Sequence, residues 1–236
     1  MPIPPLVSRM SVREEFDDWA AEGRDRGMEE RHWHTAKHAL SAMPVEAGDT
    51  VLDFGSGSGY AARALREAAD AGRAIGVDGA PEMVGNAREY TDTEEPVEFV
   101  AADFHHLPLP DDSIDHAFSM EAFYYAANPH EALAELRRVL RSGGTFYCGV
   151  NYWEEHHYSE GWQENISIPM TRWSEAEYRE AFREAGFHLA GQTRIPDTES
   201  EIPPKSEFPT EWYDSPAEYR ESDREYGTLF TVGVAP

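Results

Sequence analysis

The feature that most constrains this chain is a run of three alternating glycines between a short apolar stretch and a helical stretch. The run reads VLDFGSGSGY over residues 51–60, with Gly55, Gly57 and Gly59 at alternate positions. Glycine permits positive φ angles and lets a ligand lie against bare backbone. The helix that follows supplies free N–H groups in its first turn. A strand, a glycine turn and a helix in this order predict an α/β fold that binds a ligand at the turn.

Strands and helices alternate along the rest of the chain. The predicted strands cover residues 50–54, 74–78, 97–102, 114–120, 145–153, 188–195 and 228–234. The predicted helices cover residues 12–22, 29–42, 60–70, 81–90, 129–141 and 174–185, with a short one expected from Pro216. Ser174 and Glu177 have the spacing of a capping box at the start of the helix over 174–185. This alternation predicts a mostly parallel, doubly wound sheet with helices on both faces.

The composition of the chain is strongly acidic. It contains 45 Asp and Glu against 20 Lys and Arg, for a formal charge of -25, and the acids are spread over the whole length. A phosphate-binding face needs clustered Lys and Arg, so we expect no nucleic-acid partner. A compact state that repels itself this strongly is expected to gain stability as salt is added. The pattern resembles that of cytoplasmic proteins from salt-accumulating microbes.

Several classes of site and compartment are disfavoured. A membrane span needs about eighteen uncharged apolar residues in a row, and the sequence has no such run. Residues 1–19 lack the apolar core and cleavage site of a secretory signal, so we expect a cytoplasmic protein without a membrane partner. Cys148 lies in an apolar run and is expected to be a buried, small apolar residue. His34 and His38 are four residues apart on a predicted helix but have no local third ligand, so we expect no metal site.

The residues around the glycine turn distinguish between two classes of cofactor. Asp53 lies two residues before the first glycine, where its carboxylate would repel a pyrophosphate and suit a ligand with a cationic amino group. No Lys or Arg lies within the turn to favour a phosphate. Asp78, at the end of the second predicted strand, can accept both hydroxyls of a ribose in either class. These residues disfavour a dinucleotide such as NAD.

Three segments carry a resemblance to a known family. They read VLDFGSGSGY (51–60), IGVDGAPEMVGNARE (75–89) and FVAADFHHLPLPDDSIDHAFSMEAFYYAANPHEALAELRRVLRSGG (99–144). In these segments the chain resembles the class I S-adenosylmethionine-dependent methyltransferases, in particular the small-molecule, methyltransferase type 11-like group. The resemblance implies a seven-stranded sheet with the order 3-2-1-4-5-7-6, in which strand 7 is antiparallel. It also implies S-adenosyl-L-methionine as the cofactor.

The resemblance further implies where the cofactor lies. Asp53 and the loop through Gly59 would hold the methionine part, and Asp78 would bind the ribose hydroxyls. Asp103 would take the adenine amino group, and the segment from Ser119 would flank the sulfonium. The full implied set is Asp53, Gly55, Ser56, Gly57, Gly59, Asp78, Gly79, Met83, Ala102, Asp103, Phe104, Ser119 and Met120.

The methyl acceptor is expected at the same edge of the sheet. Methyl transfer from a sulfonium mainly needs alignment of donor and acceptor, so we expect no fixed catalytic triad and assign no catalytic residue. A general base is needed only if the acceptor loses a proton. The candidate acceptor residues are Trp33, His34, Glu121, Tyr124, Tyr125, Asn151 and Tyr152, with Phe123, Trp153 and Trp162 beside them. An aromatic box around a cationic amine is one hypothesis for this pocket.

The resemblance implies a single methyltransferase domain over residues 1–236. Residues 1–47 would form a helical lid, 48–196 the Rossmann-like core, 197–226 an insertion and 227–236 the final strand. The aromatic residues of the insertion are Phe208, Trp212, Tyr213 and Tyr219. They could close the pocket or form a dimer contact, so a monomer and a homodimer both stay open.

Other functions compete with a small-molecule methyltransferase. A non-catalytic regulator that binds S-adenosylmethionine is one, because no residue of the acceptor site is diagnostic of turnover. A nucleotide-cofactor oxidoreductase is a second, disfavoured by Asp53. An RNA methyltransferase is a third. Base-amine methylases usually carry an Asn/Asp-Pro-Pro-Tyr/Phe motif after the fourth strand, whereas this chain has SMEAFYY over residues 119–125.

Overall fold

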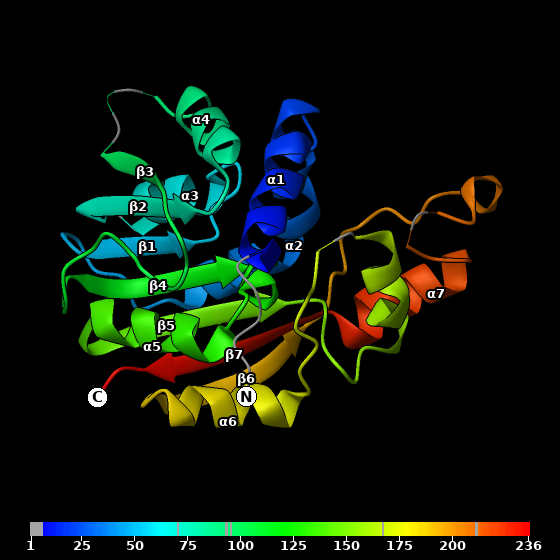
Figure 1. Cartoon of the computed structure of the whole chain (residues 1–236). Coiled ribbons are helices and arrows are strands. Elements are labelled where there is room, and N and C mark those ends of the chain that lie inside the picture. The colour runs from blue at the N-terminus through cyan, green and yellow to red at the C-terminus, as the bar shows by residue number, and fades with distance from the viewer. Residues whose placement is uncertain (1–6, 70, 93, 95, 167, 211) are drawn as a thin grey trace.

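A seven-stranded sheet forms the centre of the molecule (Figure 1). The computed structural model describes residues 7–69, 71–92, 94, 96–166, 168–210 and 212–236. The strands are β1 (Thr50–Phe54), β2 (Arg73–Asp78), β3 (Val97–Ala101), β4 (Ile114–Met120), β5 (Leu140–Val150), β6 (His188–Ile195) and β7 (Thr228–Val234). Their order is β3-β2-β1-β4-β5-β7-β6. β7 runs antiparallel to β5 and β6, and the remaining pairs are parallel, which confirms the predicted fold class and strand order.

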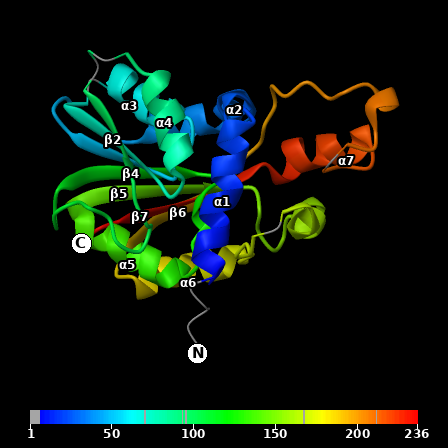
Figure 2. The same cartoon turned by 45° about the horizontal axis from the view of Figure 1, so that its top comes forward.

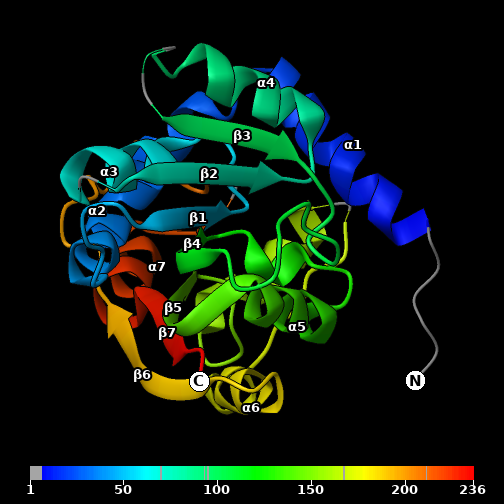
Figure 3. The ribbon, with the colours of Figure 1, turned by 90° about the vertical axis from the view of Figure 1, so that its left-hand side faces the viewer.

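Helices cover both faces of the sheet (Figure 3). The helices are α1 (Val7–Ala21), α2 (Arg26–Ala42), α3 (Tyr60–Ala69), α4 (Pro81–Glu89), α5 (Pro129–Val139), α6 (Glu175–Glu184) and α7 (Pro216–Glu221). Side chains of β1 alternate between two cores, as strand geometry requires. Val51 packs in the core with α2, α3 and α4, whereas Leu52 and Phe54 pack in the core with α5 and α6. The predicted capping box of Ser174 and Glu177 is confirmed at the start of α6.

The structure corrects several predicted boundaries. The first two helices begin at Val7 and Arg26, before the expected residues 12 and 29. A further change lies between α5 and β5. The helix expected over 129–141 ends at Val139, and the strand expected over 145–153 runs from Leu140 to Val150. Leu140 is fully buried and pairs with Ile114 in an extended conformation, so burial in the sheet outweighs the helical pattern there.

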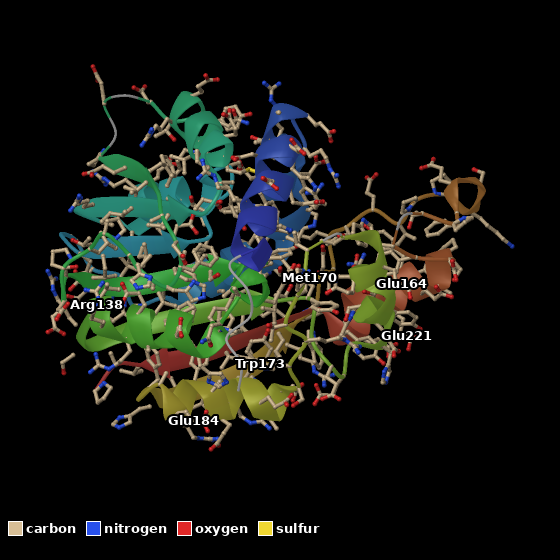
Figure 4. All side chains as sticks on the ribbon, viewed as in Figure 1. Arg138, Glu164, Met170, Trp173, Glu184 and Glu221 are labelled. Carbon is tan, nitrogen blue, oxygen red and sulfur yellow. The ribbon has the colours of Figure 1, made fainter. Side chains whose placement is uncertain are left out.

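An outer lobe lies beyond the carboxyl ends of the parallel strands (Figure 1 and Figure 2). We define it as residues 151–170 and 197–227, which are far apart in the sequence. The hydroxyl of Tyr158 donates to Glu221 Oε2 at 2.8 Å and joins the two segments. Figure 4 shows Met170 where the lobe meets the strand ends. The helix expected from Pro216 is confirmed as α7 within this lobe.

Two sequence-based expectations concern single features of the chain. Cys148 is buried on β5, and burial raises the pKa of its thiol, so the expectation of a buried, small apolar residue is confirmed. Within the described residues, no helix combines the length and apolar character needed to cross a membrane.

Candidate functional site

A large cavity opens where the parallel strands end. Its volume is about 1090 Å³, above the roughly 300–1,000 Å³ typical of a site for one drug-sized ligand. Its wall includes a residue at the end of each parallel strand from β1 to β5, namely Gly55, Asp78, Ala102, Glu121 and Asn151. Residues of α1, α2 and the outer lobe complete the wall. The cavity has room for a cofactor and an acceptor together.

The glycine loop forms a bare-backbone section of this wall. Gly55 and Gly57 have φ angles of 83° and 48°, which favour glycine. A Cβ on Gly55 would lie 2.1 Å from the Cβ of Ala122, so glycine lets the loop after β1 approach the loop after β4. Ser56, between the two glycines, is buried, and its hydroxyl has no hydrogen-bond partner among the described residues. The loop therefore offers a ligand both close backbone contact and a hydroxyl.

Asp78 joins two loops from the end of β2. Its Oδ2 accepts the N–H of Gly57 and its Oδ1 accepts the N–H of Ala80, both at 2.9 Å. Burial raises the pKa of Asp78, and these two backbone hydrogen bonds oppose the shift. Each carboxylate oxygen retains further lone-pair capacity. Asp78 can therefore accept two neighbouring hydroxyls, as a ribose would present.

Asp103 is held in place by a histidine two residues later. The backbone N–H of His105 donates to Asp103 Oδ1 at 2.9 Å, and the Nδ1 of its ring contacts the same oxygen. The Nε2 of His105 accepts the N–H of Asn128 at 3.0 Å, so the ring proton lies on Nδ1 and is donated to the carboxylate. Phe104 packs against Phe54 with ring centroids 4.1 Å apart and the planes tilted by 33°, and it forms an apolar wall beside Asp103. Our sequence reasoning missed the supporting role of His105.

Most of the expected cofactor residues line the cavity. These are Gly55, Ser56, Gly57, Asp78, Gly79, Met83, Ala102, Asp103, Phe104 and Met120. Three others, Asp53, Gly59 and Ser119, are buried outside the cavity wall. Asp53 Oδ2 accepts the N–H of Ala62 at 3.1 Å in the first turn of α3, and burial raises the pKa of Asp53 to about 7. A Cβ on Gly59 would lie 2.5 Å from the ring of Phe99, so this glycine serves helix–strand packing.

Glu121 places a carboxyl group in the cavity directly after β4. Its φ angle is 55°, a conformation that is uncommon for a residue other than glycine and is often found at functional sites. Its Oε2 accepts the hydroxyl of Tyr124 at 3.0 Å, and its Oε1 accepts the N–H of Asn151. Burial nevertheless raises the pKa of Glu121 to about 7. A carboxyl group with a near-neutral pKa can take up a proton from a bound ligand.

The candidate acceptor residues divide into two groups. Those in the cavity wall are Glu121, Tyr124, Tyr125, Asn151 and Trp162. Those outside the wall are Trp33, His34, Phe123, Tyr152 and Trp153. Tyr152 lies behind the wall, with its ring centroid 5.7 Å from that of Tyr124.

The phase of α2 explains the position of Trp33 and His34. The α2 residues that face the cavity are Gly27, Met28, Arg31, His32 and Thr35. Helical geometry directs the side chains of Trp33 and His34 away from the cavity, and Trp33 is 37% exposed. His34 Nδ1 lies 3.1 Å from Asp197 Oδ2, which joins α2 to the outer lobe.

The outer lobe adds wall residues that sequence reasoning did not place. Trp212, Tyr213 and Tyr219, for which a pocket and a dimer contact were both open, lie in the cavity wall. His156 and Asp223 also line the cavity and were not anticipated. No local pattern signals them, because their proximity depends on how two distant segments fold together.

The described residues fit the predicted cofactor. Asp78 presents carboxylate oxygens for a ribose, Ser56 adds a hydroxyl that has no hydrogen-bond partner among the described residues, and Gly55 and Gly57 present bare backbone in the cavity wall. Asp103 and Phe104 provide an acceptor and a flat apolar surface for an adenine ring. No group of three or more His, Cys, Asp or Glu is arranged to hold a metal ion within the described part of the chain.

Comparison with known proteins gives a family match over the core and a match at high identity over nearly the whole chain. A family model described as a methyltransferase domain matches residues 52–148. The chain is 62% identical to the putative methyltransferase of a solved complex with the Haloferax volcanii Trm112 methyltransferase activator. That match covers 94% of this chain and 98% of the other, with a TM-score of 0.89.

Further relatives are less complete matches. The chain is 41% identical over 116 residues to an uncharacterised 37.1 kDa transposon protein of Streptomyces fradiae, covering 49% of this chain and 34% of that protein. Curated relatives are also named as sterol, arsenite and malonyl-[acyl-carrier protein] methyltransferases, and the chain spans between 27% and 48% of their length. Geranyl diphosphate C-methyltransferase from Streptomyces coelicolor, solved with S-adenosyl-L-homocysteine, shares the fold at 16% identity, with a TM-score of 0.65 and coverage of 84% and 78%.

Proposed function

Since this chain belongs to the class I S-adenosylmethionine-dependent methyltransferases, we propose that it methylates a small molecule held beside the cofactor in one cavity. The cavity of about 1090 Å³ is the observation that carries this proposal. It has the glycine loop and Asp78 in one part and the aromatic residues of the outer lobe in another. The named relatives have acceptors of unlike chemistry and do not identify the acceptor of this chain.

Each part of the cavity has a separate task in this proposal. Asp78 binds the ribose hydroxyls, Asp103 the adenine amino group, and the loop around Gly57 the methionine part. The α1 and α2 segment, within residues 1–47, serves as a lid over the cofactor. Phe16 and Trp19 of α1 and Met28 of α2 support this role because they lie in the cavity wall. Excluding water in this way aligns the reacting groups and prevents hydrolysis.

The chemistry needs little from the protein beyond alignment and one proton acceptor. When bound, S-adenosylmethionine supplies an activated methyl group, which bonds to a lone pair of the acceptor as the carbon–sulfur bond breaks and its electrons stay on sulfur. An acceptor atom that carries a hydrogen must also lose a proton. Glu121 takes that proton on a carboxylate oxygen, because its pKa is raised to about 7 by burial.

Calorimetric titration in molar KCl tests the cofactor assignment. Wild-type protein should bind S-adenosylmethionine and not NAD. Asp78→Ala should weaken S-adenosylmethionine binding by about 100-fold or more, since it removes two charge-assisted hydrogen bonds to the ribose. Asp18→Ala, which removes an exposed acid on α1, is the matched control and should bind normally. Binding of NAD alone, or of neither ligand by folded protein, would refute the proposal.

The competing functions make different predictions for the same protein. A non-catalytic regulator would bind S-adenosylmethionine and form no S-adenosylhomocysteine with any acceptor. An oxidoreductase would bind a dinucleotide.

We also propose a cytoplasmic location in a salt-accumulating microbe, supported by the net charge of -25 and by the Haloferax volcanii complex that contains a similar methyltransferase.

A second proposal concerns a protein partner. The putative methyltransferase at 62% identity was solved with the Haloferax volcanii Trm112 methyltransferase activator, and we infer that this chain binds a protein of the same type. Co-expression with that activator should give a complex that stays together through size-exclusion chromatography in 2 M KCl. Two separate peaks at micromolar concentration would contradict the inference.

A further inference from the structure

The outer part of the cavity differs in composition from the part around the glycine loop. We call it the outer chamber and define it by the wall residues His156, Trp162, Asp197, Trp212, Tyr213, Tyr219 and Asp223. Asp197 and Asp223 both contribute carboxylates to the wall. Among the described wall residues from position 151 onward there is no Lys or Arg. The outer chamber is therefore aromatic and acidic and offers no fixed cation to an anionic ligand.

Aromatic rings form the sides of the outer chamber. The ring centroids of Trp162 and Trp212 lie 5.7 Å apart, and that of His156 lies 5.8 Å from Trp162. Tyr213 and Tyr219 form a second pair at 4.8 Å. The faces of tryptophan and tyrosine rings attract cations through their negative quadrupole.

The two carboxylates of the outer chamber are not equivalent. Asp197 Oδ1 accepts the N–H groups of Glu199 and Ser200, both at 2.9 Å. Its Oδ2 contacts the Ser200 hydroxyl and lies 3.1 Å from His34 Nδ1. Both oxygens of Asp197 are thus occupied within the protein.

Asp223 differs because its Oδ2 is buried without a hydrogen-bond partner among the described residues. The neighbouring Arg224 donates to the backbone carbonyls of Asp197 and Ser200. Burial, followed by the charge of Asp197, raises the pKa of Asp223 to about 7, although a hydrogen bond from the Ser200 side chain and the charge of Arg224 oppose the shift. A ligand with a positive charge at Asp223 would remove this cost.

A buried histidine supplies an independent sign of a ligand. His156 is 2% exposed and lies in the cavity wall, and its Nδ1 has no partner among the residues that the structure describes. Its Nε2 lies 3.0 Å from the Ser222 hydroxyl, which lies 2.9 Å from the hydroxyl of Tyr213. Burial lowers the pKa of His156 to about 4, so the ring is neutral at pH 7 and adds no positive charge to the chamber.

Tyr213 lies in the wall of the outer chamber, and its hydroxyl responds to carboxylates of the chamber and of the proposed centre of methyl transfer. After burial, the charges of Asp223 and Glu121 both raise the pKa of Tyr213. Tyr213, Asp223 and Glu121 all line the same cavity, so the outer chamber is continuous with the proposed centre of methyl transfer.

We propose that the outer chamber binds a protonated amine of the methyl acceptor, with the ammonium group on Asp223 and the adjoining hydrocarbon against the edge-to-face pair of Trp162 and Trp212. This inference rests on the proposed function, because it names the class of acceptor for the same cavity. An ammonium group provides the N–H donors that Asp223 Oδ2 lacks and is attracted to the aromatic rings. An anionic acceptor would meet the carboxylate of Asp223, and the neighbouring Arg224 is already engaged by Asp197 and two backbone carbonyls.

Probe molecules matched in shape and different in charge test the inference. Tyramine, 4-ethylphenol and 4-hydroxyphenylacetate share one ring and carry a cation, no charge and an anion; a benzyl and a butyl series repeat the comparison. Each is titrated calorimetrically into wild-type protein saturated with S-adenosylhomocysteine in 2 M KCl at pH 7.5. In at least one series the amine should bind about tenfold or more tightly than its neutral and anionic partners. Equal affinities, preference for a carboxylate, or no amine binding overturns the inference.

A pair of matched variants assigns the preference to Asp223. Asp223→Asn should reduce the affinity for the preferred amine by about tenfold or more, to the level of the neutral probe, because it removes the charge with little change in shape. Glu201→Gln makes the same change in net charge at an exposed position of the outer lobe and should leave amine binding unchanged. Equal effects of the two variants would show a general electrostatic response and refute the assignment.

The same titrations separate this inference from the proposed function. Wild-type and Asp223→Asn protein should bind S-adenosylmethionine with the same affinity, since Asp223 lies in the outer chamber and not at the glycine loop. Failure to bind S-adenosylmethionine at all would defeat the methyltransferase proposal. Normal S-adenosylmethionine binding without any preference for amines would defeat the acceptor class alone.

Discussion

Glu121→Gln is expected to lower kcat by about 100-fold or more while changing the affinity for S-adenosylmethionine much less. The substitution keeps the shape of the side chain and removes its ability to take a proton. Wild-type kcat should rise with pH and level off above about 7, because burial raises the pKa of Glu121 to about 7 and only the ionised form is a base. The variant should lose this inflection. The measurement is the rate of S-adenosylhomocysteine formation with any acceptor that supports turnover.

A control variant and an alternative outcome make this prediction specific. Glu164→Gln removes an exposed carboxylate on the outer lobe (Figure 4) and should leave the pH profile unchanged. A Glu121→Gln enzyme with wild-type kcat and an unchanged inflection would show that Glu121 does not act as the base.

The pH dependence of stability provides a readout of Glu121 that needs no acceptor. Its pKa is raised from 4.5 to about 7 in the folded protein, so the folded state holds this proton more tightly than the unfolded state. The resulting stability is fully present below about 4.5 and is lost as pH rises to about 7. Glu121→Gln should therefore make the decline in melting temperature between pH 5 and 8 shallower, by about 3 °C or more. Parallel curves for wild type and variant, recorded in 2 M KCl, would contradict the raised pKa.

Gly55→Ala is expected to destabilise the protein and to abolish measurable cofactor binding. The new Cβ would lie 2.1 Å from the Cβ of Ala122 and 3.3 Å from the ring of Phe104, at a φ of +83°. Left-handed backbone costs an alanine about 1–2 kcal/mol, and overpacking adds about 1–3 kcal/mol. The loop must shift, so the backbone approach on which cofactor binding depends is lost. Urea unfolding and calorimetric titration with S-adenosylmethionine measure the two effects.

Gly48→Ala separates backbone strain from steric overlap. Gly48 also has a positive φ, +96°, but nothing lies within 4 Å of the Cβ that alanine would add. The free energy of unfolding of this variant should fall by about 1–2 kcal/mol, from the strain of left-handed backbone alone. It should bind the cofactor normally. If both variants lose the same stability and both bind S-adenosylmethionine, the contact between Gly55 and the loop after β4 is not needed for the site.

The sequence alone determined the core of the fold, because its signals are local. Apolar runs at strand spacing and amphipathic runs at helix spacing recur with short connections, and parallel strands bring their carboxyl ends to one edge of a sheet. β1, β4, β6 and β7 have the predicted bounds, and the glycine loop and Asp78 lie at that edge. The limits of local pattern appear at Leu140, where burial against Ile114 overrides a helical period.

Tertiary structure decided which side chains reach the cavity and what covers it. Asp53 and Gly59 are close to the glycine turn in sequence, yet neither lies in the cavity wall. Asp53 accepts a hydrogen bond from the first turn of α3, and Gly59 packs against the ring of Phe99. Arg31 and His32 lie on the face of α2 that lines the cavity, whereas Trp33 lies on another face of the same helix and is exposed.

The outer chamber depends entirely on contacts between distant segments. His156 and Tyr213 share the hydroxyl of Ser222, and residues 151–170 meet residues 197–227 only in the folded chain. No periodicity or spacing encodes such a meeting, because its free energy comes from burial and hydrogen bonds across long loops, not from local conformational preference. The family and cofactor can therefore be predicted from the sequence, whereas the acidic, aromatic surface that faces the acceptor is visible only in three dimensions.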